Sequence, residues 1–333
     1  MYDFKSVNLL NNKKCVKDKK YSNLQLYKIN YSFSFLLIKN NDSTIPVFLT
    51  CRYLRNYFRI EFKGTILNIF YEDFVTCIKE RNLSKNGDNI FYTGLLNGKL
   101  TEWEIVSYID NLNPKQRKKS KTNFRLKVKE LKYVYAHKSS ITAIEIYNKQ
   151  NIIITSGEDK YIYIRKIFDF ELLTVINLTY SFGNPMISKT CDIFPSLIKV
   201  SELNLLYVLL YDYDSKNTII RGYNLNGLFF GQTDPIFFKD QKIYLLFNNI
   251  SFTKNSNLIV GFYNSNKFCV LSASTLIPFW LKEIITNKEK NQNCGTNIVE
   301  YNYKNDEFYV LYDNKIIIMN INDKNEKKEF DSF

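Results

Sequence analysis

The segment from His137 to Lys166 constrains the fold more than any other part of this chain. Apolar and polar residues alternate from Ile141 to Tyr147, a second apolar run covers Ile152–Ile154, and a third alternating run begins at Tyr161. A short turn with glycine and acidic residues separates the second run from the third. Period-two alternation predicts β-strands, and the turn predicts that they pair. Such a small sheet leaves its faces uncovered, so it implies further copies of itself along the chain.

Five more segments repeat the order strand, strand, turn, strand. The upstream copies have turns near residues 55 and 97, and the downstream copies have turns near 215, 265 and 314. With the copy at 159, the spacing runs from about 42 to about 62 residues, near or above the roughly 40–45 of a WD repeat. The sequence therefore predicts an all-β fold, a WD-repeat β-propeller with six blades. A seventh blade stays open if Phe33–Lys39 belongs to a unit separate from Ile45–Phe62.

Turns, loops and the ends of the propeller follow from Gly, Pro and charged residues. We expect Thr50 to begin the first turn with Arg55-Asn56 inside it, and a polar, basic loop from Asn111 to Lys132. We expect the last blade to end at its third strand, because Asp323–Phe333 is mostly charged. Leu24–Ile29 would then supply the missing outer strand and close the ring, which removes exposed sheet edges. The expected organisation is an N-terminal extension (1–23), a propeller (24–322) and a charged C-terminal tail (323–333).

Two blades carry residues that are typical of a WD structural network. In many WD blades a His before the first strand, a Ser or Thr on the second, a turn Asp and a third-strand Trp are hydrogen-bonded. His137 is the only histidine of the chain, and Thr155 or Ser156 supplies the hydroxyl, but Arg165 takes the Trp place, so this network is expected to be incomplete. Asn in place of the turn Asp keeps the local hydrogen bonding. The residues predicted to form these networks are His137, Ser156 and Asp159 in one blade and Asn97 and Trp103 in the other.

The sequence offers no positive sign of an enzyme. No P-loop, G-x-G-x-x-G or H-E-x-x-H motif is present. The paired carboxylates Glu72-Asp73 and Glu158-Asp159 lie at expected turns, where acidic side chains satisfy backbone N–H groups. The six cysteines are scattered without metal-ligand spacing, so we expect reduced core residues. We expect no catalytic residue, no metal, no cofactor and no small-molecule substrate.

The net charge of +13 comes with a composition rich in Lys, Asn and Ile, which an AT-rich genome produces without selection for a partner. The densest basic run follows Pro114. It can be a solvated loop between blades, or a contact with an anionic membrane worth about 1 kcal/mol per basic residue. Nucleic acid is less favoured, because no aromatic residue is interleaved before Phe124. The residues of this candidate anionic-surface contact are Lys115, Arg117, Lys118, Lys119 and Lys121.

Several segments together resemble the C-terminal WD-repeat propeller of the BEACH-domain family, proteins of vesicle and membrane trafficking. Ser156–Ile176, Ile45–Ile60 and Asn224–Gln232 carry the resemblance. It implies a non-catalytic scaffold that binds other proteins, located in the cytoplasm and peripheral to endomembranes. The paired-arginine motif F-R-R-G of the lipid-binding propellers is absent, so that mode of lipid binding is not expected.

Overall fold

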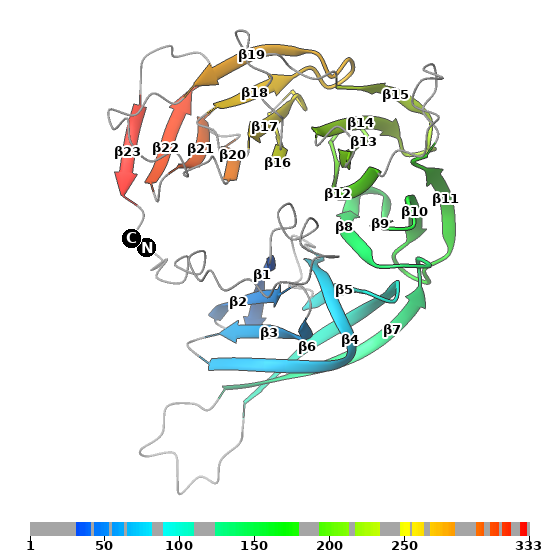
Figure 1. Ribbon diagram of the computed structural model, residues 1–333. Coiled ribbons are helices and arrows are strands. Elements are labelled where there is room, and N and C mark those ends of the chain that lie inside the picture. Colours follow the sequence, from blue (N-terminus) through cyan, green and yellow to red (C-terminus); the bar gives the residue numbers. More distant parts are fainter. Residues whose placement is uncertain are drawn as a thin grey trace, which may run out of the picture. The chain divides into compact units, whose positions relative to one another are not determined.

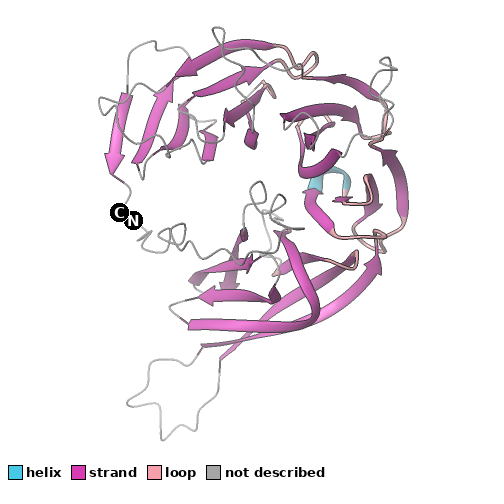
Figure 2. Ribbon diagram, viewed as in Figure 1, coloured by secondary structure: helices cyan, strands magenta, loops and turns pink. Residues whose placement is uncertain are grey.

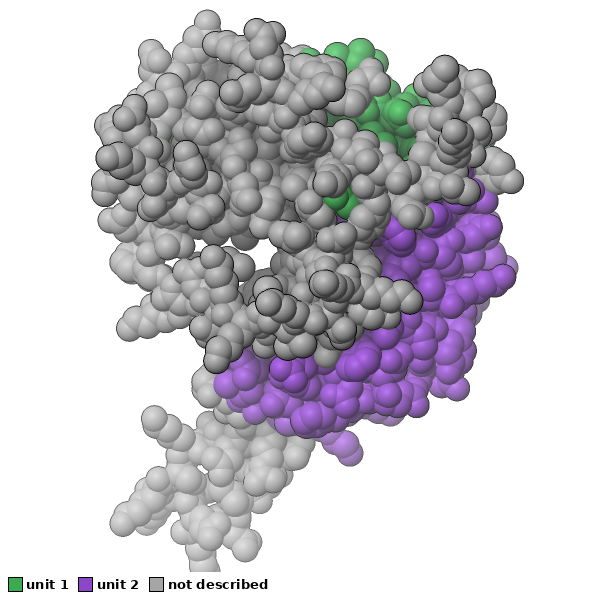
Figure 3. Space-filling model, in the orientation of Figure 1, with its two compact units in different colours: residues 1–27, 181–193, 199–333 green, residues 28–180, 194–198 purple. Residues whose placement is uncertain are grey.

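The computed structural model describes residues 31–40, 43–52, 55–62, 65–81, 89–109, 124–179, 193–212, 217–233, 247–253, 255–262, 267–283, 298–302, 307–312, 315–320 and 327–331. These residues are all-β with antiparallel sheets, and their single helical turn is the 3-10 segment Asn148–Gln150 (Figure 2). No helix in this part of the chain has the length and apolar character needed to span a membrane. The chain divides into two compact units, residues 28–180 with 194–198, and residues 1–27, 181–193 and 199–333 (Figure 3).

A seven-stranded sheet begins the unit of residues 28–180 and 194–198, with its strands in sequence order (Figure 1). Strand β4 changes partner along its length, because Thr65–Phe70 pairs with β3 whereas Val75–Glu80 pairs with β5. The sheet is therefore two four-stranded groups, β1–β4 and β4–β7, that share β4. The strands are β1 (Tyr31–Asn40), β2 (Ser43–Arg52), β3 (Arg55–Phe62), β4 (Thr65–Glu80), β5 (Ile90–Leu95), β6 (Lys99–Ile109) and β7 (Phe124–Tyr135).

The core of this sheet lies between its two groups of strands. Phe58 of β3 meets Phe91 and Trp103 of the second group edge-on, with ring centroids 5.4 and 5.2 Å apart. Leu49 and Ile60 are fully buried beside them. Alternating apolar residues produce this arrangement, since every second side chain of a strand points to the same face. Burial of large aromatic side chains supplies most of the stabilisation of such a core.

The second sheet has the strand order β11-β10-β9-β8 and packs against the first within the same unit. Thr76 Oγ1 of β4 donates hydrogen bonds to the carbonyl oxygens of Ile141 (2.6 Å) and Gly94 (2.9 Å). Lys79 of β4 forms an ion pair of 2.9 Å with Glu145 of β8. The strands are β8 (Ile141–Tyr147), β9 (Ile152–Gly157), β10 (Tyr161–Lys166) and β11 (Leu172–Asn177).

Three further four-stranded sheets follow, each with its strands in sequence order. The Tyr207 hydroxyl of β13 donates 2.9 Å to the carbonyl of Ala273, which follows β18. The first sheet has β12 (Ile193–Val200), β13 (Leu205–Asp212), β14 (Asn217–Asn224) and β15 (Phe229–Gln232). The second has β16 (Phe247–Phe252), β17 (Leu258–Phe262), β18 (Lys267–Leu271) and β19 (Pro278–Glu283). The third has β20 (Ile298–Asn302), β21 (Glu307–Tyr312), β22 (Lys315–Asn320) and β23 (Lys327–Asp331).

Five of the six turns expected from the sequence fall between two strands that pair antiparallel, and the first lies next to such a connection, with Arg55-Asn56 at the start of β3. The pairs are β2–β3, β5–β6, β9–β10, β13–β14, β17–β18 and β21–β22. Phe33–Lys39 lies within β1 and pairs with β2, in the same sheet as Ile45–Phe62. A seventh blade required Phe33–Lys39 to belong to a unit separate from Ile45–Phe62, and this pairing places both segments in one sheet.

Three boundaries differ from the expectation. Thr50 continues β2 opposite Arg59, and β3 already begins at Arg55, because β-branched and aromatic residues hold the pairing up to a shorter turn. The expected loop from Asn111 to Lys132 ends earlier, since β7 begins at Phe124. Exposed lysines alternate with half-buried apolar residues along β7, a pattern that suits an edge strand.

The third difference concerns the C-terminal region. Lys327–Asp331 forms β23 and pairs with β22 along its whole length, so the last sheet has a fourth strand from its own end of the chain. Charged residues are typical of a strand at the edge of a sheet, which explains why the charge misled the prediction. The extension 1–23, the strand expected at Leu24–Ile29 and the basic run Lys115–Lys121 lie outside the described residues.

Candidate interaction surface

A hydrogen-bonded network joins the loop before β8 to the turn between β9 and β10. His137 Nδ1 lies 2.9 Å from Asp159 Oδ1, and His137 Nε2 lies 2.9 Å from Thr155 Oγ1. The Asp159 carboxylate also accepts the backbone N–H groups of Lys138 (3.0 Å) and Tyr161 (3.2 Å). Burial acts to raise the pKa of Asp159, but the hydrogen bond from His137 and the two backbone donors outweigh it and hold that pKa below its usual range.

The structure places one predicted residue of this network differently. Ser156 is not a partner of His137, because neighbouring residues of a strand face opposite sides and Thr155 faces the histidine. The Ser156 hydroxyl instead lies 3.0 Å from that of Thr142 on β8. Arg165 stands outside the network, as the sequence indicated, and its guanidinium lies over the ring of Tyr163.

The register of the first sheet shows which residues occupy the same places there. Trp103 stands opposite Phe91, two residues before Thr93, just as Arg165 stands opposite Ile153, two residues before Thr155. The indole Nε1 of Trp103 donates 2.9 Å to the Thr93 hydroxyl. Trp103 thus keeps the bond to the second-strand hydroxyl that Arg165 does not make.

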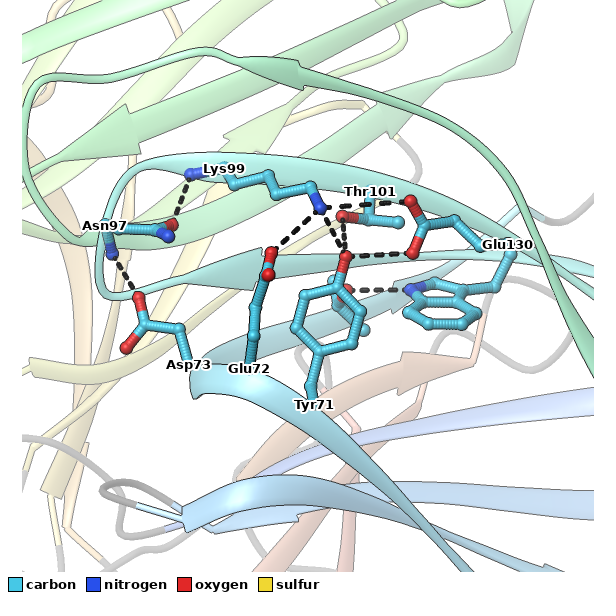
Figure 4. Close-up of polar contacts among 9 residues, drawn as sticks. Tyr71, Glu72, Asp73, Asn97, Lys99, Thr101 and Glu130 are labelled. Carbon is cyan, nitrogen blue, oxygen red and sulfur yellow. Dashed lines mark hydrogen bonds and ion pairs between the residues drawn. The ribbon is translucent and has the colours of Figure 1, made fainter.

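Asn97 holds the turn of the first sheet in the way Asp159 holds that of the second. Its Oδ1 accepts the backbone N–H of Lys99 at 3.1 Å, and its own backbone N–H donates 2.9 Å to Asp73 Oδ2 (Figure 4). Asn97 therefore holds the β5–β6 turn through Lys99 and Asp73, whereas Trp103 of β6 binds Thr93 of β5. The histidine place is taken by Tyr71, which stands four residues before Val75 as His137 stands four before Ile141.

Lys99 is buried among acidic and aromatic side chains in a cluster that the sequence analysis missed (Figure 4). Its Nζ donates 2.6 Å to the Tyr71 hydroxyl and 3.2 Å to Glu72, and lies 3.8 Å from Glu130. The Tyr71 hydroxyl in turn donates 2.9 Å to Glu130, and the Tyr133 ring lies 4.0 Å from the ammonium. Every polar atom that faces the ammonium can therefore accept a hydrogen bond or stabilise its charge.

A bulge in the β6–β7 pairing brings Glu130 into this cluster. The register shifts between Glu102 and Trp103, so Lys132 stands opposite Glu102 but Glu130 stands opposite Trp103. Leu131 is the additional residue of the bulge. Bulges re-aim side chains next to sites in this way, and no local sequence pattern indicates where one will fall.

The chemistry of the Lys99 cluster is structural. Burial acts to lower the pKa of Lys99, but its hydrogen bonds to Tyr71 and Glu72 outweigh burial and raise that pKa above its ordinary value. Burial raises the pKa of Tyr71 as well. A general base at neutral pH needs a pKa near 7, so both shifts move these groups away from catalysis.

A second polar chain ties β7 to the turn between β10 and β11. The buried Tyr92 hydroxyl donates 2.7 Å to Glu102, whose carboxylate lies 3.4 Å from Lys132 Nζ. Lys132 also donates to the carbonyl oxygens of Ile167 (2.8 Å) and Phe168. Burial first, and Glu102 second, raise the pKa of Tyr92, so this hydroxyl stays a donor. These hydrogen bonds fix β7 of the first sheet against the β10–β11 turn of the second sheet.

Exposed apolar side chains gather on these outer strands. Phe168, in the turn between β10 and β11, is 88% exposed. Exposed apolar side chains that gather into a patch mark interaction sites in soluble proteins. The exposed apolar residues of β7 and β11 are Leu131, Tyr133, Tyr135, Leu172, Leu173 and Val175.

Metal chemistry finds no support in the described part of the chain, where no group of three or more His, Cys, Asp or Glu side chains is placed to hold an ion. Cys51, Cys77 and Cys269 are buried there. Burial raises the pKa of the Cys269 thiol to about 12. The basic residues Lys115–Lys121 fall outside the described residues, so their surroundings stay a matter of prediction.

Comparisons with known proteins bear on the fold. No family model matches the chain, and no curated protein matches it. Among solved structures, Sqt1 of Saccharomyces cerevisiae, a WD-repeat protein, aligns with a TM-score of 0.56 at 12% identity over 85% of this chain and 69% of that chain. The computationally designed Ika8 protein aligns with a TM-score of 0.52 at 13% identity over 90% of this chain and 74% of that one. At these identities the likeness supports a WD-like propeller fold and carries no function with it.

Proposed function

We propose that this chain is a non-catalytic scaffold that binds other proteins through the outer strands of a six-bladed WD-type propeller. The observation that carries the proposal is the fold itself, a series of small antiparallel sheets like those of a WD-repeat protein. We assign the six proposed blades to the β1–β4 and β4–β7 groups and to the four later sheets. Sheets of this kind present rigid strands and loops to partners.

The polar residues of the two networks support this proposal because they already have hydrogen-bond partners within the protein. Asp159, His137 and Lys99 all have hydrogen-bond partners within the protein, and these partners shift the pKa of Asp159 down and that of Lys99 up, toward the charged forms. A satisfied buried network makes a structure rigid and specifies one arrangement. The exposed apolar side chains of β7 and β11 are then a candidate binding surface within the described part of the chain.

The association with vesicle and membrane trafficking rests on the sequence resemblance to BEACH-associated propellers. It predicts partners among trafficking proteins and a cytoplasmic location peripheral to endomembranes. An immunoprecipitation after mild cross-linking in cells tests both, with partners identified by mass spectrometry. Partners drawn from other processes alone would remove the trafficking part of the proposal.

The scaffold itself is tested by comparing two surface variants in the same pull-down. Tyr135→Ser with Phe168→Ser removes two exposed aromatic side chains of the proposed surface, whereas Leu203→Ser with Leu228→Ser removes two exposed apolar side chains elsewhere. The first variant should lose at least about tenfold of the captured protein, as expected when hot-spot aromatic residues are lost. The control should capture as much as wild type. Capture by wild type no greater than by empty beads would refute the scaffold.

A membrane contact through Lys115, Arg117, Lys118, Lys119 and Lys121 is the second candidate. β6 and β7 pair as far as Ile109 opposite Phe124, whereas the pairing of β5 with β6 ends at Glu104, so the ends of β6 and β7 extend past β5 (Figure 1). Exposed Lys127 of β7 adds charge near these ends. Flotation with vesicles containing phosphatidylserine tests this function. Unchanged flotation after replacement of the five basic residues by Ser would exclude it.

A further inference from the structure

A stacked row of side chains lies on one face of β10. The rings of Tyr161 and Tyr163 are stacked with centroids 6.0 Å apart, and the Arg165 guanidinium carbon lies 5.5 Å from the centre of the Tyr163 ring. On the neighbouring strand β11, Val175 stands opposite Tyr163 and Leu172 stands opposite Arg165. Directly opposed residues share a face of the sheet, so these five residues form one surface, here named the Tyr–Arg strip.

The Tyr–Arg strip is open to solvent along β11. Leu172 and Val175 are 44% and 45% exposed, while Tyr161, Tyr163 and Arg165 are half-buried. Tyrosine and arginine are enriched among the residues that dominate binding energy at protein interfaces. Aliphatic side chains beside them provide apolar area that a partner can cover.

The Arg165 guanidinium has no carboxylate partner among the described residues. Its Nη1 donates 3.0 Å to the carbonyl oxygen of Phe170, and its Nε is buried without a hydrogen-bond partner. Burial lowers the pKa of Arg165, and only the nearby Tyr163 opposes that shift. A half-buried cation without a counter-charge carries a desolvation cost that an anionic ligand would offset.

Several other basic side chains of the same unit are already paired with carboxylates. Each of four lysine ammonium groups lies within ion-pair distance of at least one carboxylate. The pairs are Lys79 with Glu145, Lys99 with Glu72 and Glu130, Lys132 with Glu102, and Lys166 with Glu171. Arg165 differs from these four lysines in having no carboxylate within ion-pair distance among the described residues.

The far side of the strip is held in place by the buried network. The His137 ring meets the Tyr163 ring edge-on with centroids 4.7 Å apart, and His137 is itself fixed by Asp159 and Thr155. A surface that is rigid before binding loses less conformational entropy when a partner arrives. The strip thus combines the Arg165 guanidinium with a Tyr163 ring that is held in place by His137.

We infer that the Tyr–Arg strip is a docking surface for an extended acidic segment of a partner protein with aliphatic residues beside the acidic ones. A Glu or Asp carboxylate of the partner pairs with the Arg165 guanidinium, and its aliphatic side chains cover Leu172 and Val175. This inference rests on the proposed scaffold function and names the class of partner. RNA fits less well, because exposed Leu172 and Val175 offer a phosphate backbone neither a positive charge nor a hydrogen-bond donor.

Arrayed decapeptides test the inference with the full chain. Three matched sets carry the same Leu and Val residues, combined with Glu and Asp, with Ser and Gln, or with Lys and Arg. Wild type should bind the acidic set above the other two, with affinities measured by fluorescence anisotropy on the strongest acidic peptides. Arg165→Gln should weaken that binding by at least about tenfold, the loss expected for one charge-assisted pair.

Lys166→Gln is the matched control, because it removes the same charge one residue further along β10 from a lysine already paired with Glu171. It should stay within about twofold of wild type, as expected for an exposed ion pair. Val175→Glu should weaken acidic binding as well, by placing a negative charge on an exposed position of the strip. If Arg165→Gln lowers the melting temperature strongly, the Val175→Glu variant decides the question.

Three results would overturn the inference: equal binding to all three peptide sets, undiminished acidic binding by both strip variants, or preferred binding of oligouridine that depends on Arg165. In any of these cases the pull-down separates the two proposals. Wild-type chain that still captures proteins keeps its scaffold function and binds through another surface. If the wild-type chain captures no protein, both the scaffold function and the docking surface are refuted.

Discussion

The turn between β9 and β10 should depend on Asp159 far more than the corresponding turn of the first sheet depends on Asn97. Replacing Asp159 by Ala removes an acceptor for His137, Lys138 and Tyr161 at 2.9, 3.0 and 3.2 Å. At roughly 1 kcal/mol for each hydrogen bond, the free energy of unfolding should fall by about 3 kcal/mol. Asn97→Ala removes one side-chain hydrogen bond, to the N–H of Lys99, at an exposed position, and should cost about 1 kcal/mol or less.

Urea unfolding followed by tryptophan fluorescence measures both variants, because a lower midpoint at unchanged slope reports stability alone. The pH dependence gives a second check. The pKa of Asp159 is lower in the folded chain than the ordinary value near 3.9, so its stabilisation is present above about pH 4 and is lost as the pH falls through the lower folded value. The difference between wild type and Asp159→Ala should therefore shrink in acid. Equal costs for Asp159→Ala and Asn97→Ala, or a difference that is the same at pH 7 and pH 3, would refute the reasoning.

Three further predictions follow from local geometry. Gly98→Ala should cost more than about 2 kcal/mol in thermal unfolding, because Gly98 has a φ of +82° and an added Cβ would lie 2.0 Å from the His137 carbonyl oxygen; Gly231→Ala, whose nearest neighbour would be 3.9 Å away, should cost little and is the control. Lys99→Met should destabilise by about 3 kcal/mol in the same assay, since it leaves the half-buried Tyr71 hydroxyl and Glu130 without their cation, and no loss of stability would contradict the cluster. Cys269 should resist iodoacetamide at pH 8 until the chain is unfolded, because burial raises its pKa to about 12, and peptide mapping that finds it labelled in the native protein would contradict this.

The strands and their hairpins were predictable because both are encoded locally. Alternation between Ile141 and Tyr147, and turn residues such as Gly157 and Asp159, specify a strand and its partner within a few residues. β23 was missed because the prediction treated its charge as a sign of a tail, although an edge strand accepts charge on its open side. Hydropathy alone does not separate these two cases.

The Lys99 cluster was not predictable, because its members meet only after three non-local events. β4 must pair with both β3 and β5, Tyr71 must lie between these pairings, and the β6–β7 register must shift by one residue to deliver Glu130. In the same way, Thr155 and Ser156 are equivalent as hydroxyl groups in the sequence. Only the face of the strand that each occupies decides which one meets His137.

Trp103 and Arg165 show how one backbone position can serve the core in one sheet and the surface in the next. Both stand on the third strand, opposite the residue two places before the network threonine. The Trp103 indole binds Thr93 and packs in the core against Phe58. Arg165 is too polar for that place, and the structure satisfies one of its nitrogens while leaving its Nε without a partner. The Trp place in this sheet holds an arginine whose Nε has no hydrogen-bond partner within the described residues. A binding partner can supply hydrogen bonds and a counter-charge to such a guanidinium. Departures from a local rule of this kind are where function is expected. That reasoning directs the search for a binding partner to Arg165 rather than to His137, whose ring nitrogens both have partners.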